Sequence, residues 1–382
     1  MPLQNRLKGL ICGLVVLCGA QMAGAQIRTV LVSPVPGNPI ASGTALRNAL
    51  AGIPSPSSTD RWLLKIEPGI FDIGTTPLQM RSWVDMEGSG IGVTTIRGNV
   101  FLVQNSNYTA TLHGADNAEL RLLTVEALGD PAGAIAMANY YASPRLYRVK
   151  FTTYTGSATG TVWGIRNFSS APLIEECEVN VTRPSAPNTT AYGLVFIGNN
   201  IPLPAGRSSF LRSKIAVSGA STTYGVYLQN AQIINQIRES RVDVTGSTTT
   251  YGLYAVSTGQ WVGHESLQIQ NSEISSGGST FTSYGIFFDS EVLMDLDIRD
   301  SKVRGYMAPT TYGILQTGSP GTTGISLQGA SIVGLTKTIG ASANISVAST
   351  FLNGGPITSL AWLGCMGVWD ENGVFYANSC PP

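Results

Sequence analysis

Charged side chains are scarce in this chain. Asp, Glu, Lys and Arg make up 12% of its 382 residues, and 23 basic residues balance 23 acidic ones. A chain with so little charge, and no excess of either sign, has no basic surface that would hold nucleic acid by neutralising its phosphates. Nucleic acid is therefore excluded as a partner.

Histidine is almost absent, since only His113 and His264 occur. The two are far apart in the sequence, and each is interpreted as a surface or turn residue and not as a catalytic base. No Ser-His-Asp spacing, phosphate-binding loop or dinucleotide fingerprint is present. The common hydrolase and nucleotide-binding classes therefore find no support in the motifs.

Long apolar runs are also missing. The run at residues 10–17 is too short to span a bilayer. Arg6 and Lys8 precede this run, and the small residues Ala23-Gly24-Ala25 of a cleavage site follow it. This arrangement is typical of a secretory signal over residues 1–25. An amphipathic first helix is the alternative. We expect an exported mature chain without a membrane span, located in the periplasm, at the cell surface or in the medium.

Cysteine is rare as well, with five in the chain. Two of them fall within the signal segment, Cys177 lies inside the repeats described below, and Cys365 and Cys380 lie near the C-terminus. In an exported protein the last pair predicts a disulfide, which would stabilise the tail by roughly 3 kcal/mol on the chain-entropy model. Two cysteines cannot form a structural zinc site by themselves, so no metal cofactor is expected.

Glycine, in contrast, is abundant, and part of it follows a repeat. An aromatic residue and a glycine, followed by Ile, Leu or Val, return every 27 to 33 residues. The glycines of these pairs are Gly164, Gly193, Gly225, Gly252, Gly285 and Gly313. A small residue before a short alternating strand follows the first five pairs, at Cys177, Ser213, Ser240, Ser272 and Ser301. Self-similarity at this period, with an apolar period of two, predicts stacked repeats of short strands.

The predicted fold is all-β, a single right-handed parallel β-helix over residues 61–357. Each repeat forms one coil, and the coils stack about 4.8 Å apart. Because an open β-helix exposes strand edges at both ends, each end needs a cover. We expect an N-terminal cap with a short helix in residues 26–60 and a disulfide-closed cap in residues 358–382.

The repeat also predicts which side chains face inward. The residue after each glycine is always aliphatic, so we expect it inside, together with the aromatic residue two positions earlier. On this prediction the aromatic rings stack as an interior ladder and the glycines face outward. The small residues, Cys177 among them as an unreactive buried thiol, form a second interior ladder. The aromatic residues concerned are Trp163, Tyr192, Tyr224, Tyr251, Tyr284 and Tyr312.

Three stretches near the N-terminus resemble the opening coils of pectin methylesterases and other pectin-lyase-like β-helices. They are Ile66-Glu-Pro-Gly-Ile-Phe-Asp, Trp83-Val-Asp-Met-Glu-Gly-Ser-Gly and Thr94-Thr-Ile-Arg-Gly, within residues 40–99. These motifs consist of residues that form turns between strands. The resemblance therefore implies the fold and says little about the activity. The paired aspartates and the arginine of the esterases are not found, nor are the NTD, DD, GHG and RIK elements of polygalacturonases.

An outward strip of aromatic residues is the candidate binding site. The alternation after the glycine places Tyr227, Tyr254 and Phe287 outward on three consecutive coils. Aromatic rings suit the apolar faces of sugars, and exposed apolar strips usually mark binding. We therefore predict a polysaccharide bound along an outer groove. A covering loop, the C-terminal tail or another subunit, as in a homotrimer, is the alternative.

One acidic cluster is the candidate for catalysis. Asp295 and Asp297 share an outward face with Arg299, and Arg238 and Gln270 are expected on neighbouring coils in line with that arginine. Two carboxylates would begin a calcium site but not complete one, because calcium takes six to eight oxygens. The preferred function is an exported polysaccharide-binding protein without an identifiable catalytic centre. The alternative is a polysaccharide lyase or pectin esterase using this cluster, with calcium as the cofactor of the lyase.

Overall fold

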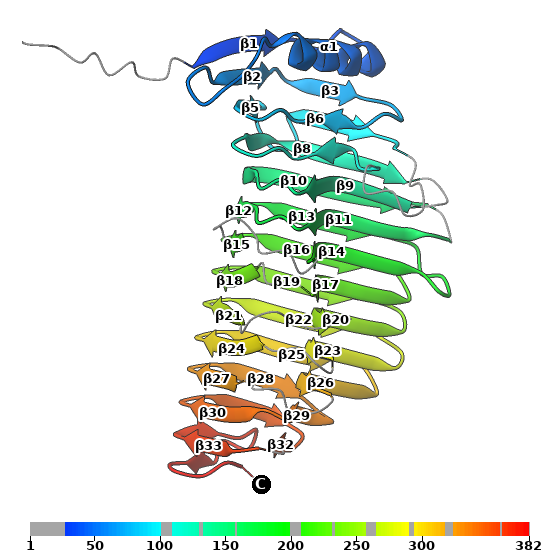
Figure 1. The fold of residues 1–382 in the computed structure, drawn as a ribbon. Coiled ribbons are helices and arrows are strands. Elements are labelled where there is room, and N and C mark those ends of the chain that lie inside the picture. Colours follow the sequence, from blue (N-terminus) through cyan, green and yellow to red (C-terminus); the bar gives the residue numbers. More distant parts are fainter. Residues whose placement is uncertain are drawn as a thin grey trace, which may run out of the picture.

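The computed structural model describes residues 27–100, 109–129, 133–156, 159–198, 208–230, 234–256, 265–289, 294–317, 324–359 and 361–381. The expected signal segment and His264 lie outside these ranges. Short strands stack in parallel along one axis, with the helix α1 at one end and the C-terminus at the other (Figure 1). The predicted right-handed parallel β-helix is confirmed. The described helix is not long and apolar enough to cross a membrane.

Each central coil contributes one strand to a sheet that we call the tyrosine sheet, and two to a second sheet that bends at a corner. The tyrosine sheet consists of β4 (Leu78–Gln79), β7 (Leu112–His113), β9 (Gly133–Tyr140), β11 (Thr161–Phe168), β14 (Thr190–Ile197), β17 (Thr222–Gln229), β20 (Thr249–Val256), β23 (Thr282–Phe288), β26 (Thr310–Gln316), β29 (Lys337–Ala341) and β32 (Ile357–Ser359). His113, expected at the surface or in a turn, is buried in β7.

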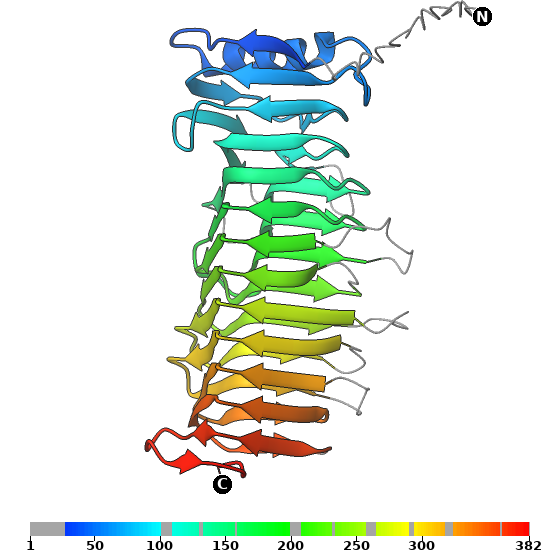
Figure 2. The same cartoon turned by 90° about the vertical axis from the view of Figure 1, so that its left-hand side faces the viewer.

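The bent sheet has two columns of strands, which β8 (Glu119–Gly129) and β10 (Arg145–Thr155) cross in one piece (Figure 2). The first column contains β1 (Arg28–Val32), β2 (Trp62–Ile66), β5 (Val84–Glu87), β12 (Leu173–Glu175), β15 (Ser208–Leu211), β18 (Ile234–Arg238), β21 (Glu265–Gln270), β24 (Met294–Arg299), β27 (Gly324–Gln328), β30 (Asn344–Ala348) and β33 (Leu363–Met366). The second column contains β3 (Gly69–Asp72), β6 (Thr94–Gly98), β13 (Glu178–Thr182), β16 (Lys214–Ser218), β19 (Arg241–Thr245), β22 (Glu273–Gly277), β25 (Lys302–Tyr306), β28 (Ser331–Gly334), β31 (Phe351–Gly354) and β34 (Val368–Trp369).

The corner between the two columns turns on one residue in each coil. Five of these corner residues have φ between 45° and 52°: Glu176, Arg212, Glu239, Asn271 and Asp300. The next residue is the small one predicted to be interior, and it is buried in every case. Ser240 shows the pattern, since its hydroxyl donates to the carbonyl of Arg238 at 2.7 Å and accepts the N–H of Ser213 at 3.1 Å. The predicted small-residue ladder is confirmed, and its hydroxyls are satisfied inside the wall.

The glycine of the repeat faces the interior, so its predicted outward position is wrong. A Cβ on Gly225 would overlap Val242 of the second column and lie 2.5 Å from the carbonyl oxygen of Gly252. The tyrosine sheet and the second column therefore approach too closely here for any side chain. Val226 is also fully buried, so two successive residues face inward. The in–out alternation changes phase between them.

The N-terminal end is covered by α1 (Pro39–Gly52). Proline at the first helical position and the Asn38 side chain, which accepts the N–H of Ala41 at 3.0 Å, start the helix. Leu46 and Leu50 are buried on the first coils. Parallel pairing includes a strand from the segment expected to form the cap, because β1 pairs with β2. The pairs β2–β5 and β3–β6 follow, so the resemblance of residues 40–99 to pectin-lyase-like opening coils holds for the fold.

At the C-terminal end the parallel pairing continues beyond residue 357. There β33 pairs with β30, and β34 pairs with β31. The chain then reverses, and β35 (Phe375–Tyr376) pairs antiparallel with β34. The expected disulfide joins Cys365 of β33 to Cys380. This hairpin and its cross-link form the end of the solenoid.

Candidate functional site

The aromatic residues of the repeat stack on the outer face of the tyrosine sheet. We call this set the tyrosine column: Trp163, Tyr192, Tyr224, Tyr251, Tyr284 and Tyr312. Successive members are paired in register, with ring centroids 4.8 to 5.9 Å apart and ring planes within 7° of parallel. The predicted ladder is thus confirmed, but its predicted inward direction is wrong. The phase change at the glycine turns these rings outward, where they are half-buried.

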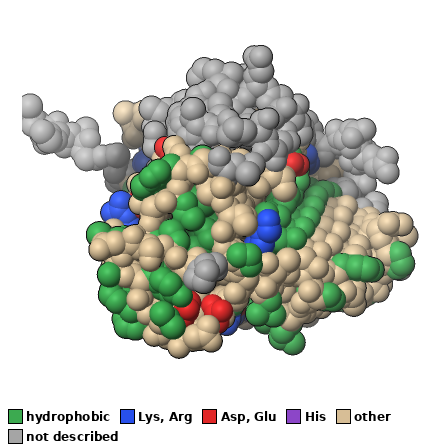
Figure 3. All heavy atoms as spheres, turned by 90° about the horizontal axis from the view of Figure 1, so that it is seen from below, with side chains coloured by type: hydrophobic (Ala, Val, Ile, Leu, Met, Phe, Trp, Pro, Cys, Tyr) green, Lys and Arg blue, Asp and Glu red, His purple; other side chains and the backbone are tan. Residues whose placement is uncertain are grey.

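A second aromatic column lies beside the first. Tyr227, Tyr254 and Phe287, which we call the aromatic triad, are paired in register and half-buried on the same outer face. Their rings stack with centroids 5.4 and 5.3 Å apart. They meet the tyrosine column edge to face, as Tyr227 meets Tyr224 at 5.3 Å and 82°. The two columns form one surface, the aromatic strip, and a row of hydrophobic side chains runs back along the solenoid in Figure 3.

The strip presents ring edges and hydroxyl groups more than open ring faces. Each ring of the tyrosine column between its two end members has a neighbour stacked against both of its faces, so it presents its edge to the outside. The phenols are recessed, because burial raises the pKa of Tyr192 and Tyr224 above the ordinary value and that of Tyr251 to about 12. Hydroxyl groups in such surroundings act as hydrogen-bonding groups and stay protonated at neutral pH.

Two charged groups flank the strip. The carboxylate of Asp289 accepts the Tyr254 hydroxyl at 3.3 Å and the Thr317 hydroxyl at 3.4 Å. Burial and this carboxylate both raise the pKa of Tyr254. Arg166 lies in the row of the aromatic triad two coils toward the N-terminus, because Arg166 pairs with Val195 and Val195 with Tyr227. Burial lowers the pKa of the Arg166 guanidinium.

The acidic cluster lies on the other sheet, in the first column. Asp297 and Arg299 form a two-point ion pair on β24, at 2.8 and 3.1 Å, and Asp295 accepts the N–H of Gly324 at 2.8 Å. Arg238 and Gln270 do lie in line with Arg299. In the part of the chain that the structure describes, no three His, Cys, Asp or Glu side chains gather as a metal site. A catalytic or calcium-binding role for the cluster stays a prediction.

Sequence reasoning missed a residue beside this cluster. Trp362 lies in the same concavity of about 440 Å³ as Asp295 and Asp297. The three residues are brought together by coil stacking across four strands, a relation that no spacing in the sequence signals. The available clue was a pair of tryptophans, Trp362 and Trp369, in the C-terminal segment.

A larger groove of about 920 Å³ follows the corner. Some of its charges pair with one another, as Arg241 does with Glu273 at 3.6 Å and Arg212 with Glu176 at 3.5 Å. At its floor Cys177 is buried, and burial raises the pKa of the thiol to about 12. The buried, unreactive thiol that the sequence predicts is thus confirmed.

No protein-family model matches the chain, and no curated protein matches it by sequence. Among solved structures, the A-module of the mannuronan C-5 epimerase AlgE6 from Azotobacter vinelandii is 12% identical over 91% of this chain and 97% of that one, with a TM-score of 0.44. A tailspike of an Acinetobacter phage is 12% identical over 92% of this chain and 64% of its own, with a TM-score of 0.39. A pectin methylesterase in complex with a hexasaccharide is 10% identical over 65% of this chain and 75% of its own, with a TM-score of 0.28. At these values the similarity concerns the general fold alone.

Proposed function

We propose that this chain is an exported protein that binds a polysaccharide along the aromatic strip. The observation that carries the proposal is the pair of stacked aromatic columns on the outer face, with one ring of the tyrosine column in each of six consecutive coils. The expected signal segment supports export, as does the disulfide between Cys365 and Cys380, because disulfides persist in oxidising compartments.

The strip suits a ligand that is itself a linear repeat. The ring centroids of Tyr192 and Tyr224, on neighbouring coils, are 4.8 Å apart. This distance is close to the length of one pyranose unit. Ring edges offer apolar surface for van der Waals contact with a sugar, and the phenols, with Asp289 beside them, offer hydrogen bonds to sugar hydroxyls. Stacked rings hold each other in place, so binding would cost little side-chain entropy.

The test compares two double variants of the full chain. Tyr227→Ala with Tyr254→Ala removes two rings of the aromatic triad, while Tyr147→Ala with Tyr154→Ala removes two tyrosines of β10 on the bent sheet. Each truncated anchor ring costs more than about 1 kcal/mol of binding, so the first variant should bind about tenfold more weakly or worse. Retention on insoluble polysaccharides and on glycan arrays is measured. Equal retention of both variants and the unaltered chain would remove the proposal.

The proposal contains no catalytic step. Purified chain incubated with pectin, polygalacturonate or alginate, with and without calcium, should therefore release no unsaturated sugar and no methanol. Ultraviolet absorbance and a methanol assay provide the measurements. Product that disappears in the Asp297→Asn variant would instead support the lyase or esterase alternative at the acidic cluster.

A further inference from the structure

The concavity beside the acidic cluster lies on the outer face of the first column, over β24, β27, β30 and β33. It has a volume of about 440 Å³ and is separate from the aromatic strip, because it belongs to the bent sheet and not to the tyrosine sheet. Trp362, with 60% of its surface exposed, borders it toward the C-terminus. Asp297 borders it on the opposite side. We call it the Trp362 pocket.

The indole of Trp362 is held against the backbone of β33. A Cβ on Gly364 would overlap the six-membered ring of Trp362, so the ring occupies the space above that glycine. The backbone of Trp362 is fixed on both sides, since its N–H donates to the Asn344 side chain at 3.2 Å and its carbonyl accepts the N–H of Ile345 at 2.8 Å. An aromatic ring this exposed, packed on glycine and tied to its neighbour strand, offers a fixed apolar surface.

The floor between the two borders is made of small residues. In register, Asp297 is followed by Ser326, then Ser346, then Gly364. Three strand spacings separate Asp297 from Gly364, about 14 Å in all, and only two serine side chains stand between them. This leaves room for a sugar ring that contacts the indole on one side and reaches the carboxylate on the other.

The polar groups of the pocket are pre-positioned. Both carboxylate oxygens of Asp297 contact Arg299, at 2.8 and 3.1 Å, and Asp295 accepts the N–H of Gly324 at 2.8 Å. A carboxylate oxygen has two lone pairs, so those of Asp297 can each accept a further hydrogen bond beside the contact with Arg299. Carboxylates are strong acceptors for sugar hydroxyls. The lining residues that the structure describes carry two carboxylates and one guanidinium, and this excess of negative charge disfavours an acidic sugar.

We propose that the Trp362 pocket is a second saccharide-binding site, which takes one unit of a neutral sugar chain. The sugar packs on the indole of Trp362, and its hydroxyls donate to Asp297 and exchange hydrogen bonds with Ser326 and Ser346. The site does not depend on the aromatic strip, because the two lie on different sheets. A chain with both sites would engage polysaccharide at two faces and gain avidity from the linkage.

The test uses tryptophan emission of the full chain during titration with cellohexaose, laminarihexaose, mannohexaose and hexagalacturonate. At least one neutral hexasaccharide should give an emission change that is lost in Trp362→Ala, and hexagalacturonate should give no change that depends on Trp362. Trp362→Ala should weaken binding by about tenfold or more, measured calorimetrically. The matched control is Trp369→Ala, which removes another exposed tryptophan of the same end and should leave the affinity within about twofold.

Two further variants separate this site from the strip and from a folding defect. Gly364→Val should displace the indole and lower the affinity as Trp362→Ala does, while circular dichroism and thermal unfolding report whether each variant is folded. The double variant Tyr227→Ala with Tyr254→Ala should keep the Trp362 response. The proposal is overturned if no neutral hexasaccharide binds, if folded Trp362→Ala binds as well as the unaltered chain, or if hexagalacturonate binds equally well and loses that binding in Trp362→Ala.

Discussion

Gly225 and Val226 are neighbours in one strand, and both face the interior of the β-helix. Regular strand geometry would put them on opposite faces. Because they share a face, Tyr224 and Tyr227 both lie outside and their rings meet edge to face at 5.3 Å. The aromatic strip therefore follows from a change of phase at glycine, repeated coil after coil.

Gly225→Ala should destabilise the protein. The added Cβ would overlap Val242 and press on the carbonyl of Gly252, and overpacking of this kind costs about 1–3 kcal/mol or more. Gly52→Ala is the matched control, because a Cβ there meets nothing within 4 Å. The control should be neutral or slightly stabilising. Urea unfolding followed by circular dichroism gives the comparison, and equal midpoints would contradict the interior position of Gly225.

Alkaline pH should unfold the protein as its tyrosines ionise. Burial raises the pKa of Tyr192 and Tyr224, and that of Tyr251 to about 12, whereas an unfolded tyrosine has a pKa of about 10. Stability from these groups is present in full below pH ~10 and is lost as pH rises toward their folded pKa values. Tyrosinate absorbance and circular dichroism should therefore change together. Ionisation of all tyrosines near pH ~10 with an intact fold would show that the column is not recessed.

Acid should weaken the first column through Glu87. Burial acts to raise the pKa of this carboxyl, but the hydrogen bonds from Lys65 and Arg121 outweigh it and lower the pKa. A lowered pKa contributes stability above pH ~4.3, and that stability is lost as pH falls through the folded value. Glu87→Gln should lower the urea midpoint at pH 7 and flatten its decline in acid.

The control for that experiment is Glu178→Gln. Glu178 is more exposed and contacts Lys150 at 3.4 Å. Exposed pairs of this kind contribute little to stability, so Glu178→Gln should change the free energy of unfolding by less than about 1 kcal/mol. Equal effects of the two substitutions would show that burial of Glu87 between its partners does not matter.

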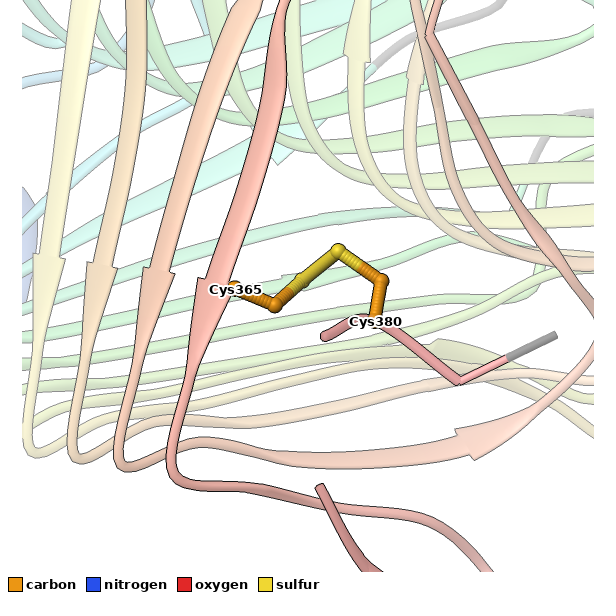
Figure 4. The surroundings of a disulfide bond; sticks show 2 residues. All are labelled: Cys365 and Cys380. Atoms are coloured by element: carbon orange, nitrogen blue, oxygen red, sulfur yellow. A yellow bond between two sulfur atoms is a disulfide. The ribbon is translucent and has the colours of Figure 1, made fainter. Parts of the chain in front are cut away.

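Loss of the disulfide should loosen the C-terminal end. Cys365 lies on the last strand of the first column, and Cys380 lies on the returning segment beside it (Figure 4). The bond closes a loop with a sequence separation of 15, so Cys365→Ser with Cys380→Ser should cost roughly 3 kcal/mol on the chain-entropy model. Protease cleavage after residue 366 and the melting temperature report the change. Cys177→Ser, a buried thiol outside the tail, should leave cleavage there unchanged.

Much of the fold can be predicted from the residues alone. The serine ladder from Ser213 to Ser301 is a sequence pattern that maps directly onto the corner, because each member makes the same local hydrogen bonds. The disulfide between Cys365 and Cys380 could likewise be predicted, because both cysteines lie in one short segment of the sequence. The face of Tyr224 could not be predicted by alternation, because the phase change at Gly225 depends on how near Val242 lies across the interior.

The sequence by itself determined the period of the coils, the strands in each coil and the residues that recur at each position. Local chemistry decides these features, since strand propensity, turn residues and small interior side chains act within one repeat. The tertiary structure alone decided which rings face outward and which residues meet across coils. Asp297 and Trp362 line the same pocket only because their coils stack within three strand spacings of each other. The distance between the facing sheets determines which way the tyrosines point. Both are properties of the packed solenoid, which no single repeat contains.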